Sequence, residues 1–250
     1  MDTSGPADDR VALITGASSG IGAATARRLA ADGTDVVLAA RRDASLATVR
    51  DQCEQAGVNA LAVPTDVTDR TAVNALVEAA VDRFGHLDTA VVNAGIGEAR
   101  DVPLPDLPVK QFERVTATNI HGAYYTTRAV LPALRESDGA LIYVGSYKGK
   151  YPSTSTPVYA ASKWWLRGFA LSVSGRVGPD GVAVTLVNPS GVRTAFGSEF
   201  RDQTNNTALD PAASLDPTDV AEAIVYASEQ EAPVAVTELD VNRRNILGRF

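Results

Sequence analysis

The sequence predicts a single α/β domain, built on a doubly wound, parallel, seven-stranded sheet with helices on both faces. Three observations lead to this prediction. Short Val/Ile/Leu/Ala runs of strand length alternate with segments of helical length along the chain. These runs are continuously apolar, which is typical of strands buried on both faces of a parallel sheet. No linker or shift in composition divides the 250 residues, and a chain of this length can bury a sizeable core.

The first half contains four predicted strands and three predicted helices. The strands are the apolar runs at residues 11–15, 35–40, 60–64 and 89–92. The helices are expected at residues 21–31 and 44–55 and, after a Thr68-Asp69 cap, as far as Phe84. Each helix ends close to a glycine, the residue that most readily adopts a helix-stopping conformation. Strands and helices that alternate at this spacing predict right-handed crossovers between parallel strands.

The second half repeats the same rhythm. Strands are predicted at residues 140–144, 182–187 and 234–239, which brings the count to seven. Helices are predicted from 110 to about 135, from 158 to about 177, and over 218–228 after an Asp216-Pro217 start. The long segment 193–215 has no clear periodicity. A loop of this length inside a compact domain is usually functional or mobile.

Composition excludes several classes of protein. The net charge of −7 gives no electrostatic footprint for nucleic acid. A single cysteine, Cys53, excludes an intrachain disulfide, and two distant histidines without cysteine partners argue against a metal site. No apolar run approaches the ~20 residues of a membrane span. The first ten residues are polar and acidic, unlike a signal peptide, so we expect a cytoplasmic protein.

A glycine-rich turn follows the first strand and opens the first helix. Its sequence is Thr15-Gly16-Ala17-Ser18-Ser19-Gly20-Ile21-Gly22. Three glycines allow a tight bend and a close approach of the backbone to a phosphate, and the helix N-terminus supplies unpaired N–H groups and a positive dipole end. A purely structural turn is the alternative. The strand–turn–helix context favours phosphate binding.

Tyr159 and Lys163 are four residues apart on the predicted helix 158–177, so they share one helix face. A tyrosine hydroxyl has a pKa of about 10, and a nearby ammonium group is expected to lower it. The pair therefore predicts a general acid/base that moves a proton on or off an alcohol oxygen. Ser146 follows the strand at 140–144, at the edge where open α/β sheets bind ligands.

The glycine spacing, G-x-x-x-G-x-G, resembles the nucleotide-binding turn of the short-chain dehydrogenase/reductases. Two more landmarks of that family are matched, by Asp66-Val67 after the third strand and by Asn93-Ala94-Gly95 after the fourth. The family's catalytic residues are matched, in chain order, by Asn119, Ser146, Tyr159 and Lys163. The resemblance covers nearly the whole chain. It implies one NAD(P)-binding, Rossmann-type catalytic domain over residues 1–250, with residues 193–215 as the substrate-binding loop.

The resemblance also implies a role for each matched residue. Lys163 would tune Tyr159 and hold the nicotinamide ribose, and Ser146 would bind the substrate oxygen. Asn119 would hold a water that links the lysine to solvent. Asp66 would bind the adenine amino group. The residues predicted to bind the cofactor are Thr15, Gly16, Ser18, Ser19, Gly20, Ile21, Gly22, Arg41, Arg42, Asp66, Val67, Asn93, Ala94, Gly95, Tyr159, Lys163, Pro189, Val192 and Thr194.

Two positions bear on the details of that cofactor site. In this fold the end of the second strand meets the adenosine ribose, where a carboxylate would repel a 2′-phosphate. The chain has Ala40-Arg41-Arg42 there, and a guanidinium binds phosphate oxygens bidentately, so NADP(H) is predicted over NAD(H). The alternative is that both arginines are solvated loop residues. After the sixth strand, Ser190 stands where the family's nicotinamide segment has glycine.

The predicted function is NADP(H)-dependent hydride transfer between the nicotinamide and a small-molecule carbonyl or secondary alcohol. A non-catalytic NADP-binding sensor or regulatory subunit is the alternative, against which the complete Tyr–Lys–Ser set argues. Sugar-nucleotide epimerases share the Tyr–Lys pair but need a longer chain with a substrate domain.

Two further groups of residues have weaker signals. Trp164 or Trp165, together with Phe169, predict an apolar helix face and a homodimer or homotetramer. Lys148 and Lys150 follow Ser146 and are expected to be solvated, with contact to an anionic substrate as the alternative.

Overall fold

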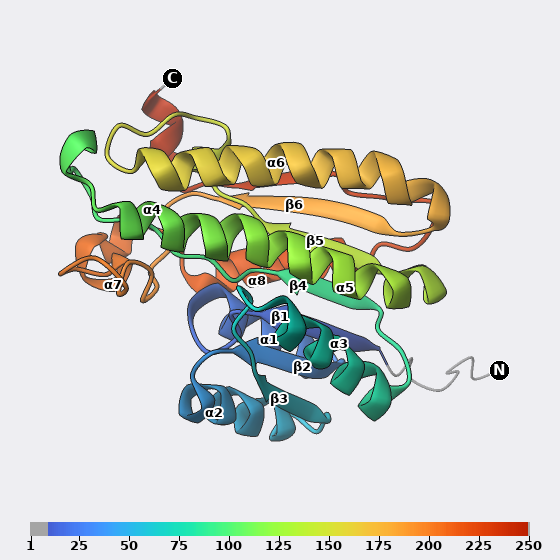
Figure 1. Ribbon diagram of the computed structural model, residues 1–250. Helices are drawn as coiled ribbons and strands as arrows, with labels where there is room; N and C mark the ends of the chain where they lie inside the picture. The colour runs from blue at the N-terminus through green and yellow to red at the C-terminus, as the bar shows by residue number, and fades with distance from the viewer. Residues whose placement is uncertain (1–9, 250) are drawn as a thin grey trace.

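The computed structural model describes residues 10–249, so most of the polar N-terminal segment considered above lies outside the described residues. The chain forms a seven-stranded parallel sheet in the order β3-β2-β1-β4-β5-β6-β7 (Figure 1), which confirms the predicted fold class. The strands are β1 Val11–Thr15, β2 Asp35–Ala40, β3 Ala60–Pro64, β4 Thr89–Val92, β5 Ala140–Val144, β6 Ala183–Pro189 and β7 Glu238–Val241.

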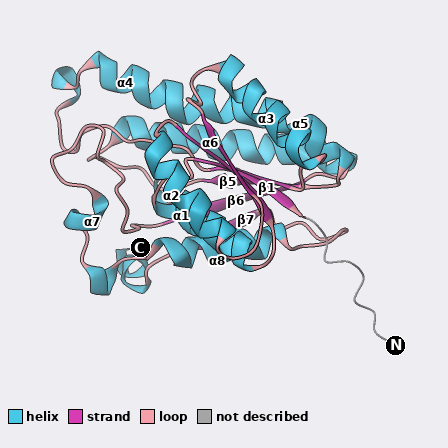
Figure 2. Ribbon diagram, turned by 90° about the horizontal axis from the view of Figure 1, so that it is seen from below, coloured by secondary structure: helices cyan, strands magenta, loops and turns pink. Residues whose placement is uncertain are grey.

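Helices connect the strands and cover both faces of the sheet (Figure 2). Their bounds are α1 Gly20–Ala31, α2 Asp43–Glu54, α3 Arg70–Phe84, α4 Val109–Thr116, α5 Ala123–Glu136, α6 Pro157–Val177, α7 Asn205–Ala208 and α8 Pro217–Ser228. Helices α1, α2 and α8 pack on one face, and α3, α5 and α6 pack on the other. Successive strand residues point to opposite faces, so the fully buried Leu13 and Ile14 of β1 belong to different cores.

The structure corrects three of the predicted elements. The last strand spans Glu238–Val241 rather than 234–239, because the regular ladder to β6 begins at the Leu186–Glu238 pair and Val234 is exposed. Strand β6 runs on to Pro189, since its last residues pair with β7. The predicted helix 110–135 is divided into α4, a π-helical segment at Ala117–Gly122, and α5.

The strand order reverses between β1 and β4, which both extend from the centre of the sheet. Their carboxyl ends are tied together by Thr15, whose hydroxyl accepts hydrogen bonds from the backbone N–H groups of Asn93 (3.0 Å) and Ala94 (3.2 Å). Open α/β sheets bind ligands in the crevice at such a reversal. The glycine turn after β1 and the Asn93-Ala94-Gly95 segment after β4 therefore lie side by side.

Candidate active site

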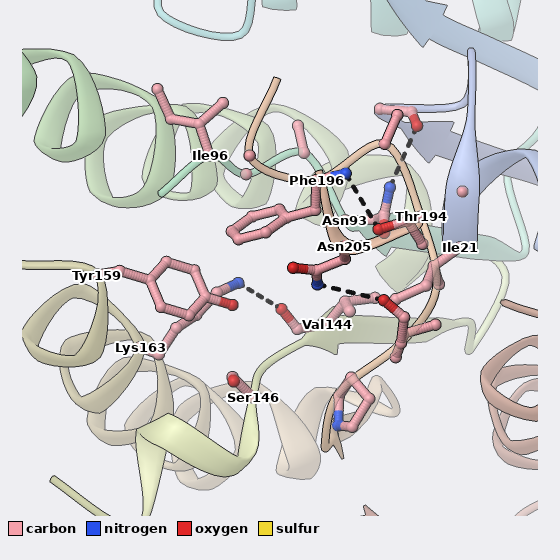
Figure 3. Close-up of a pocket in the computed structure, with 18 of the residues that line it drawn as sticks. Ile21, Asn93, Ile96, Val144, Ser146, Tyr159, Lys163, Thr194, Phe196 and Asn205 are labelled. Atoms are coloured by element: carbon pink, nitrogen blue, oxygen red, sulfur yellow. Dashed lines mark hydrogen bonds between the residues drawn. The ribbon is translucent and has the colours of Figure 1, made fainter. Parts of the chain in front are cut away.

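A cavity of about 640 Å³ opens at the carboxyl edge of the sheet and gathers most of the residues singled out in the sequence (Figure 3). Thr15, Gly22 and Asn119 are not among the residues that line it; all three are buried. The predicted residues that do line it are Gly16, Ser18, Ser19, Gly20, Ile21, Arg41, Arg42, Asp66, Val67, Asn93, Ala94, Gly95, Ser146, Tyr159, Lys163, Pro189, Val192 and Thr194.

The glycine turn fits a phosphate-bearing nucleotide. Gly16 and Gly20 have φ angles of 69° and 56°, which glycine adopts without strain. A Cβ at Gly22 would collide with the carbonyl oxygen of Gly16, so the turn closes only with glycine there. No side chain caps the N-terminus of α1, and its first turn holds no acidic residue. Its N–H groups and dipole are therefore available to an anion.

At the end of β2, Arg41 is held by a carboxylate of segment 193–215. Its Nη2 lies 3.0 Å from Glu199 Oε2, and Arg114 Nε lies 3.5 Å from Glu199 Oε1. The hydrogen bond from Arg41, with the charges of both arginines, lowers the pKa of Glu199 against the opposing effect of burial. Segment 193–215 is thus anchored to the end of β2 by charge.

Asp66 lies beside these arginines, in the loop after β3. Its Oδ1 accepts hydrogen bonds from the backbone N–H (2.9 Å) and the hydroxyl (2.8 Å) of Thr68. Burial acts to raise the pKa of Asp66, but the two hydrogen bonds and the charges of Arg114 and Arg41 lower it overall. The carboxylate is therefore ionised and fixed at the cavity wall.

Tyr159 and Lys163 come from adjacent turns of α6, as the spacing predicts. Lys163 Nζ lies 5.8 Å from the centre of the Tyr159 ring and donates a 2.7 Å hydrogen bond to the carbonyl oxygen of Val144 (Figure 3). Burial lowers the pKa of Lys163 to about 8. The ammonium group is thus held by the end of β5 rather than by the phenol.

The expected lowering of the Tyr159 pKa by Lys163 is wrong for this structure. Burial raises the pKa of Tyr159, against smaller opposing effects of a hydrogen bond from Ser146 and the charge of Arg201. Desolvation dominates because the phenol is packed against the ring of Phe196, with ring centres 5.2 Å apart. The hydroxyl is therefore in its protonated form at neutral pH.

Ser146 stands directly after β5, where the sequence places it. Its side-chain oxygen accepts a 3.1 Å hydrogen bond from the backbone N–H of Lys148 and so caps the short turn Tyr147–Gly149. This contact fixes the side chain at the cavity wall beside Tyr159. A hydroxyl in this position can donate to an oxygen that also faces the phenol.

Asn119 lies in the π-helical segment and has a different environment from the one expected. Its side chain donates to the carbonyl of Ile96 (2.9 Å) and to the hydroxyl of Ser162 (3.0 Å), and it accepts from the N–H of Ile96 (2.9 Å). It therefore ties the loop after β4 to α6 from behind the cavity. The water relay implied by the family resemblance stays a prediction. π-Helical segments are frequent at functional sites.

The segment after β6 accommodates serine in place of the usual glycine. The backbone N–H of Ser190 donates to Val241 (2.9 Å), and its hydroxyl accepts from the backbone N–H of Arg243 (2.9 Å). The extra side chain is thus used to hold the segment after β7. Thr194 lies against Gly20 and accepts a 3.1 Å hydrogen bond from the N–H of Phe196.

Three residues near Tyr159, namely Glu98, Phe196 and Arg201, are not predicted from the sequence, and a fourth, Lys148, is placed differently from the expectation. Glu98 is fully buried, and its carboxylate accepts from the backbone N–H groups of Val158 (2.8 Å) and Tyr159 (3.0 Å) at the start of α6. Lys148 was expected in solvent but is half-buried and lines the cavity. The other two, Phe196 and Arg201, come from segment 193–215, whose composition gives no local signal.

Comparison with known proteins agrees with this geometry. The family described as short chain dehydrogenase matches residues 10–205. An uncharacterized oxidoreductase of Staphylococcus aureus strain MW2 is 35% identical over 234 residues, covering 93% of this chain and 96% of that protein.

Two solved structures have the same fold. An alcohol dehydrogenase from the archaeon Thermococcus sibiricus, complexed with 5-hydroxy-NADP, superposes with a TM-score of 0.85 at 29% identity, over 94% of this chain and 97% of that one. A 3-ketoacyl-(acyl-carrier-protein) reductase from Brucella melitensis, complexed with NADH, gives a TM-score of 0.85 at 30% identity, over 95% and 98%. Fold and site thus define a nucleotide-dependent oxidoreductase. The chain belongs to the short-chain dehydrogenase/reductase family.

Residues 10–249 contain neither a candidate membrane span nor a candidate metal-ligand cluster. None of the helices combines the length and the apolarity that a membrane span requires. In the same part of the chain, no three His, Cys, Asp or Glu side chains cluster as metal ligands.

Proposed function

We propose that this oxidoreductase uses NADP(H) to interconvert a carbonyl compound and a secondary alcohol, with Tyr159 as the general acid/base. The observation that supports it best is the convergence of Ser146, Tyr159 and Lys163 on one cavity whose other end is the glycine turn. A hydroxyl beside a half-buried phenol can hold an alcohol or carbonyl oxygen and move one proton to or from it.

The residues along the cavity fit the parts of a nicotinamide dinucleotide. The turn Gly16–Gly22 and the N-terminus of α1 would hold the pyrophosphate, and Asp66 would hold the adenine. Lys163 would bind the nicotinamide ribose, and Thr194 the carboxamide. When bound, the cofactor supplies or accepts the hydride.

The choice of NADP(H) rests on this chain's own residues, because the solved relatives were complexed one with an NADP derivative and one with NADH. Arg41 and Arg42 directly follow the last residue of β2, and both line the cavity. Arg41 already binds the carboxylate of Glu199. A 2′-phosphate is an oxoanion of the same kind and can take that place.

The proton chemistry favours reduction at neutral pH. Burial raises the pKa of Tyr159, so its hydroxyl is ready to donate a proton to a carbonyl oxygen as the oxygen gains charge. Ser146 donates a hydrogen bond to the same oxygen and so orients the substrate. Oxidation of an alcohol needs the phenolate, which becomes available only at higher pH.

The test of this proposal is turnover with a panel of aldehydes and ketones, followed at the absorbance band of reduced nicotinamide. Each substrate is offered with NADPH and with NADH. The proposal predicts carbonyl-dependent oxidation of NADPH in preference to NADH. A protein that binds NADPH but oxidises it with no carbonyl would be the non-catalytic sensor instead, and a preference for NADH would refute the cofactor assignment.

We also propose that the enzyme is a homo-oligomer that pairs through α4, α5 and α6. Large apolar side chains are exposed there: Trp164 is 46% exposed, Phe112 52% and Tyr124 45%. Trp165 and Phe169, by contrast, stack on one another (ring centres 4.8 Å apart) and pack against the core. Exposed apolar residues gathered on neighbouring helices are typical of a subunit interface.

A further inference from the structure

Three basic side chains line the cavity beyond Ser146 and Tyr159, and each comes from a different segment. Arg100 follows β4, Lys148 follows β5, and Arg201 belongs to segment 193–215. They are close enough for the charges of Arg100 and Arg201 to lower the pKa of Lys148. The fold thus brings three cations to one end of the cavity.

Lys148 is placed for a ligand rather than for solvent. It is half-buried, and its Nζ donates a 2.6 Å hydrogen bond to the hydroxyl of Thr156, which is completely buried. Within residues 10–249 it forms no salt bridge. Lys150, two residues on, lies outside the cavity and is paired with Glu238 (3.2 Å) and Asp240 (2.7 Å).

Arg201 brings its charge close to the reacting groups. Its Nε donates to the carbonyl oxygen of Glu98 (2.8 Å), and its guanidinium carbon lies 5.1 Å from the centre of the Phe196 ring. Phe196 in turn packs on Tyr159. At this position the charge of Arg201 acts to lower the pKa of Tyr159, against the larger effect of burial.

The acidic groups nearby do not neutralise this cluster. Glu98 and Asp101 act to raise the pKa of Lys148, but burial and the two arginines outweigh them, and it falls to about 8. The Glu98 carboxylate is already occupied by N–H groups at the start of α6.

Among the described residues that line the cavity, the carboxylates lie away from Lys148. They are Asp66 and Glu199, both close to Arg41 at the far end. Unpaired cations in a partly desolvated place are costly, and an anion would relieve that cost.

We propose that the substrate of this enzyme is a carbonyl compound bearing an oxoanion, a carboxylate or a phosphate, which Lys148 and Arg201 bind with the help of the exposed Arg100. The inference rests on the proposed function and names its substrate class. An oxo acid becomes the hydroxy acid by gaining one hydride from the reduced nicotinamide at the carbonyl carbon and one proton from Tyr159 at the oxygen. Solvent restores the proton, and the oxoanion is unchanged.

The test compares matched pairs of substrates, in which one member carries the oxoanion and the other lacks its charge. Short oxo acids, with the carboxylate at increasing distance from the ketone, are paired with their methyl esters, and dihydroxyacetone phosphate is paired with dihydroxyacetone. The expected result is a kcat/KM at least tenfold higher for the charged member of at least one pair, chiefly through KM. The carboxylate and phosphate pairs show which oxoanion is preferred. A wild-type enzyme that reduces the neutral members equally well or better overturns the inference and leaves the proposed function intact.

Substitution of Lys148 identifies the group responsible. Lys148→Met is expected to reduce the preference for the charged member at least tenfold, since it removes a charge-assisted contact. Lys148→Arg should restore part of it, and Lys150→Met is the matched control that should keep the wild-type ratio. An unchanged ratio in Lys148→Met would overturn the inference. A chain that reduces no carbonyl of either kind would instead refute the proposed function.

A pH profile provides a second readout. Lys148 is charged below a pKa of about 8 and loses its charge as the pH rises through that value. The ratio of acid to ester turnover should therefore fall on the alkaline side. Glu98 and Asp101 are the acidic groups that face Lys148, and Arg100 and Arg201 are the basic ones. Taking the ratio cancels the titration of Tyr159 and Lys163, which both substrates share. A ratio that does not change with pH in the wild type would contradict the role of Lys148.

Discussion

Glu98→Gln should both destabilise the protein and slow it, because Glu98 holds the first turn of the helix that bears Tyr159. Its buried carboxylate accepts hydrogen bonds from Val158 N (2.8 Å) and Tyr159 N (3.0 Å). A glutamine retains one acceptor oxygen and turns an NH₂ group toward the other donor. Loss of one hydrogen bond to a charged group costs about 1.5–3 kcal/mol, and loss of the favourable charge at a helix N-terminus adds about 0.5–1 kcal/mol.

A total of about 3 kcal/mol corresponds to a fall in Tm of roughly 6–12 °C for a domain of this size. The assay is thermal unfolding followed by circular dichroism, beside kcat for the best carbonyl substrate. Glu78→Gln, at an exposed carboxylate on α3, is the matched control and should leave both values within error. A Tm for Glu98→Gln within 2 °C of the wild type, roughly the scatter of a surface substitution, would refute the reasoning.

Three other perturbations test separate parts of the site. Arg41→Ala should raise KM for NADPH and leave KM for NADH little changed, whereas Glu199→Gln, which frees Arg41, should lower KM for NADPH. Steady-state kinetics with both cofactors measures the two variants, and equal effects on KM for NADH would contradict the role of Arg41. Lys163→Met should abolish turnover yet raise the free energy of unfolding at pH 7 by about 2 kcal/mol. Burial lowers the pKa of Lys163 to about 8 from its usual value of about 10.4, so the buried charge destabilises the folded wild type by about 3 kcal/mol. The lost hydrogen bond to Val144 offsets about 1 kcal/mol of that gain. This gain in stability should shrink as the pH rises from about 8 toward 10.4, since Lys163 is then neutral in the folded wild type but still protonated in the unfolded chain. Denaturant titrations of both proteins across that pH range measure the gain, and a constant gain would contradict the account. Trp164→Glu should convert an oligomer to a 26.2 kDa monomer in light scattering, and a wild type that is already monomeric at micromolar concentration would refute the interface.

The residues that the sequence predicted well are those whose positions are set by local structure. The turn Gly16–Gly22 must follow a strand and open a helix, and Tyr159 and Lys163 share a face of α6 because of helix geometry alone. Strands such as β1 and β5 were found because each is a buried apolar run. In these cases a few neighbouring residues determine the outcome.

What the sequence missed depends on contacts between distant segments. The sequence predicts that Lys148 is an exposed loop residue, whereas the fold places it beside Thr156 and Arg201. The pKa of Tyr159 depends on desolvation by Phe196, which comes from a segment with no periodicity. The last strand is predicted at the apolar run 234–239, but regular pairing with β6 begins only at Glu238, so the predicted position is wrong.

The most direct measurement of the proposed chemistry is kcat/KM for Tyr159→Phe beside a fluorescence titration of NADPH. The substitution removes the hydroxyl and keeps the ring that packs on Phe196. Loss of general acid–base catalysis is typically worth ~10²–10⁴ in rate, so we predict a fall of that size in kcat/KM with the Kd for NADPH unchanged. Ser146→Ala, which removes an orienting contact alone, should fall between this variant and the wild type. Turnover near the wild-type value in Tyr159→Phe would contradict the role of Tyr159 as the acid/base.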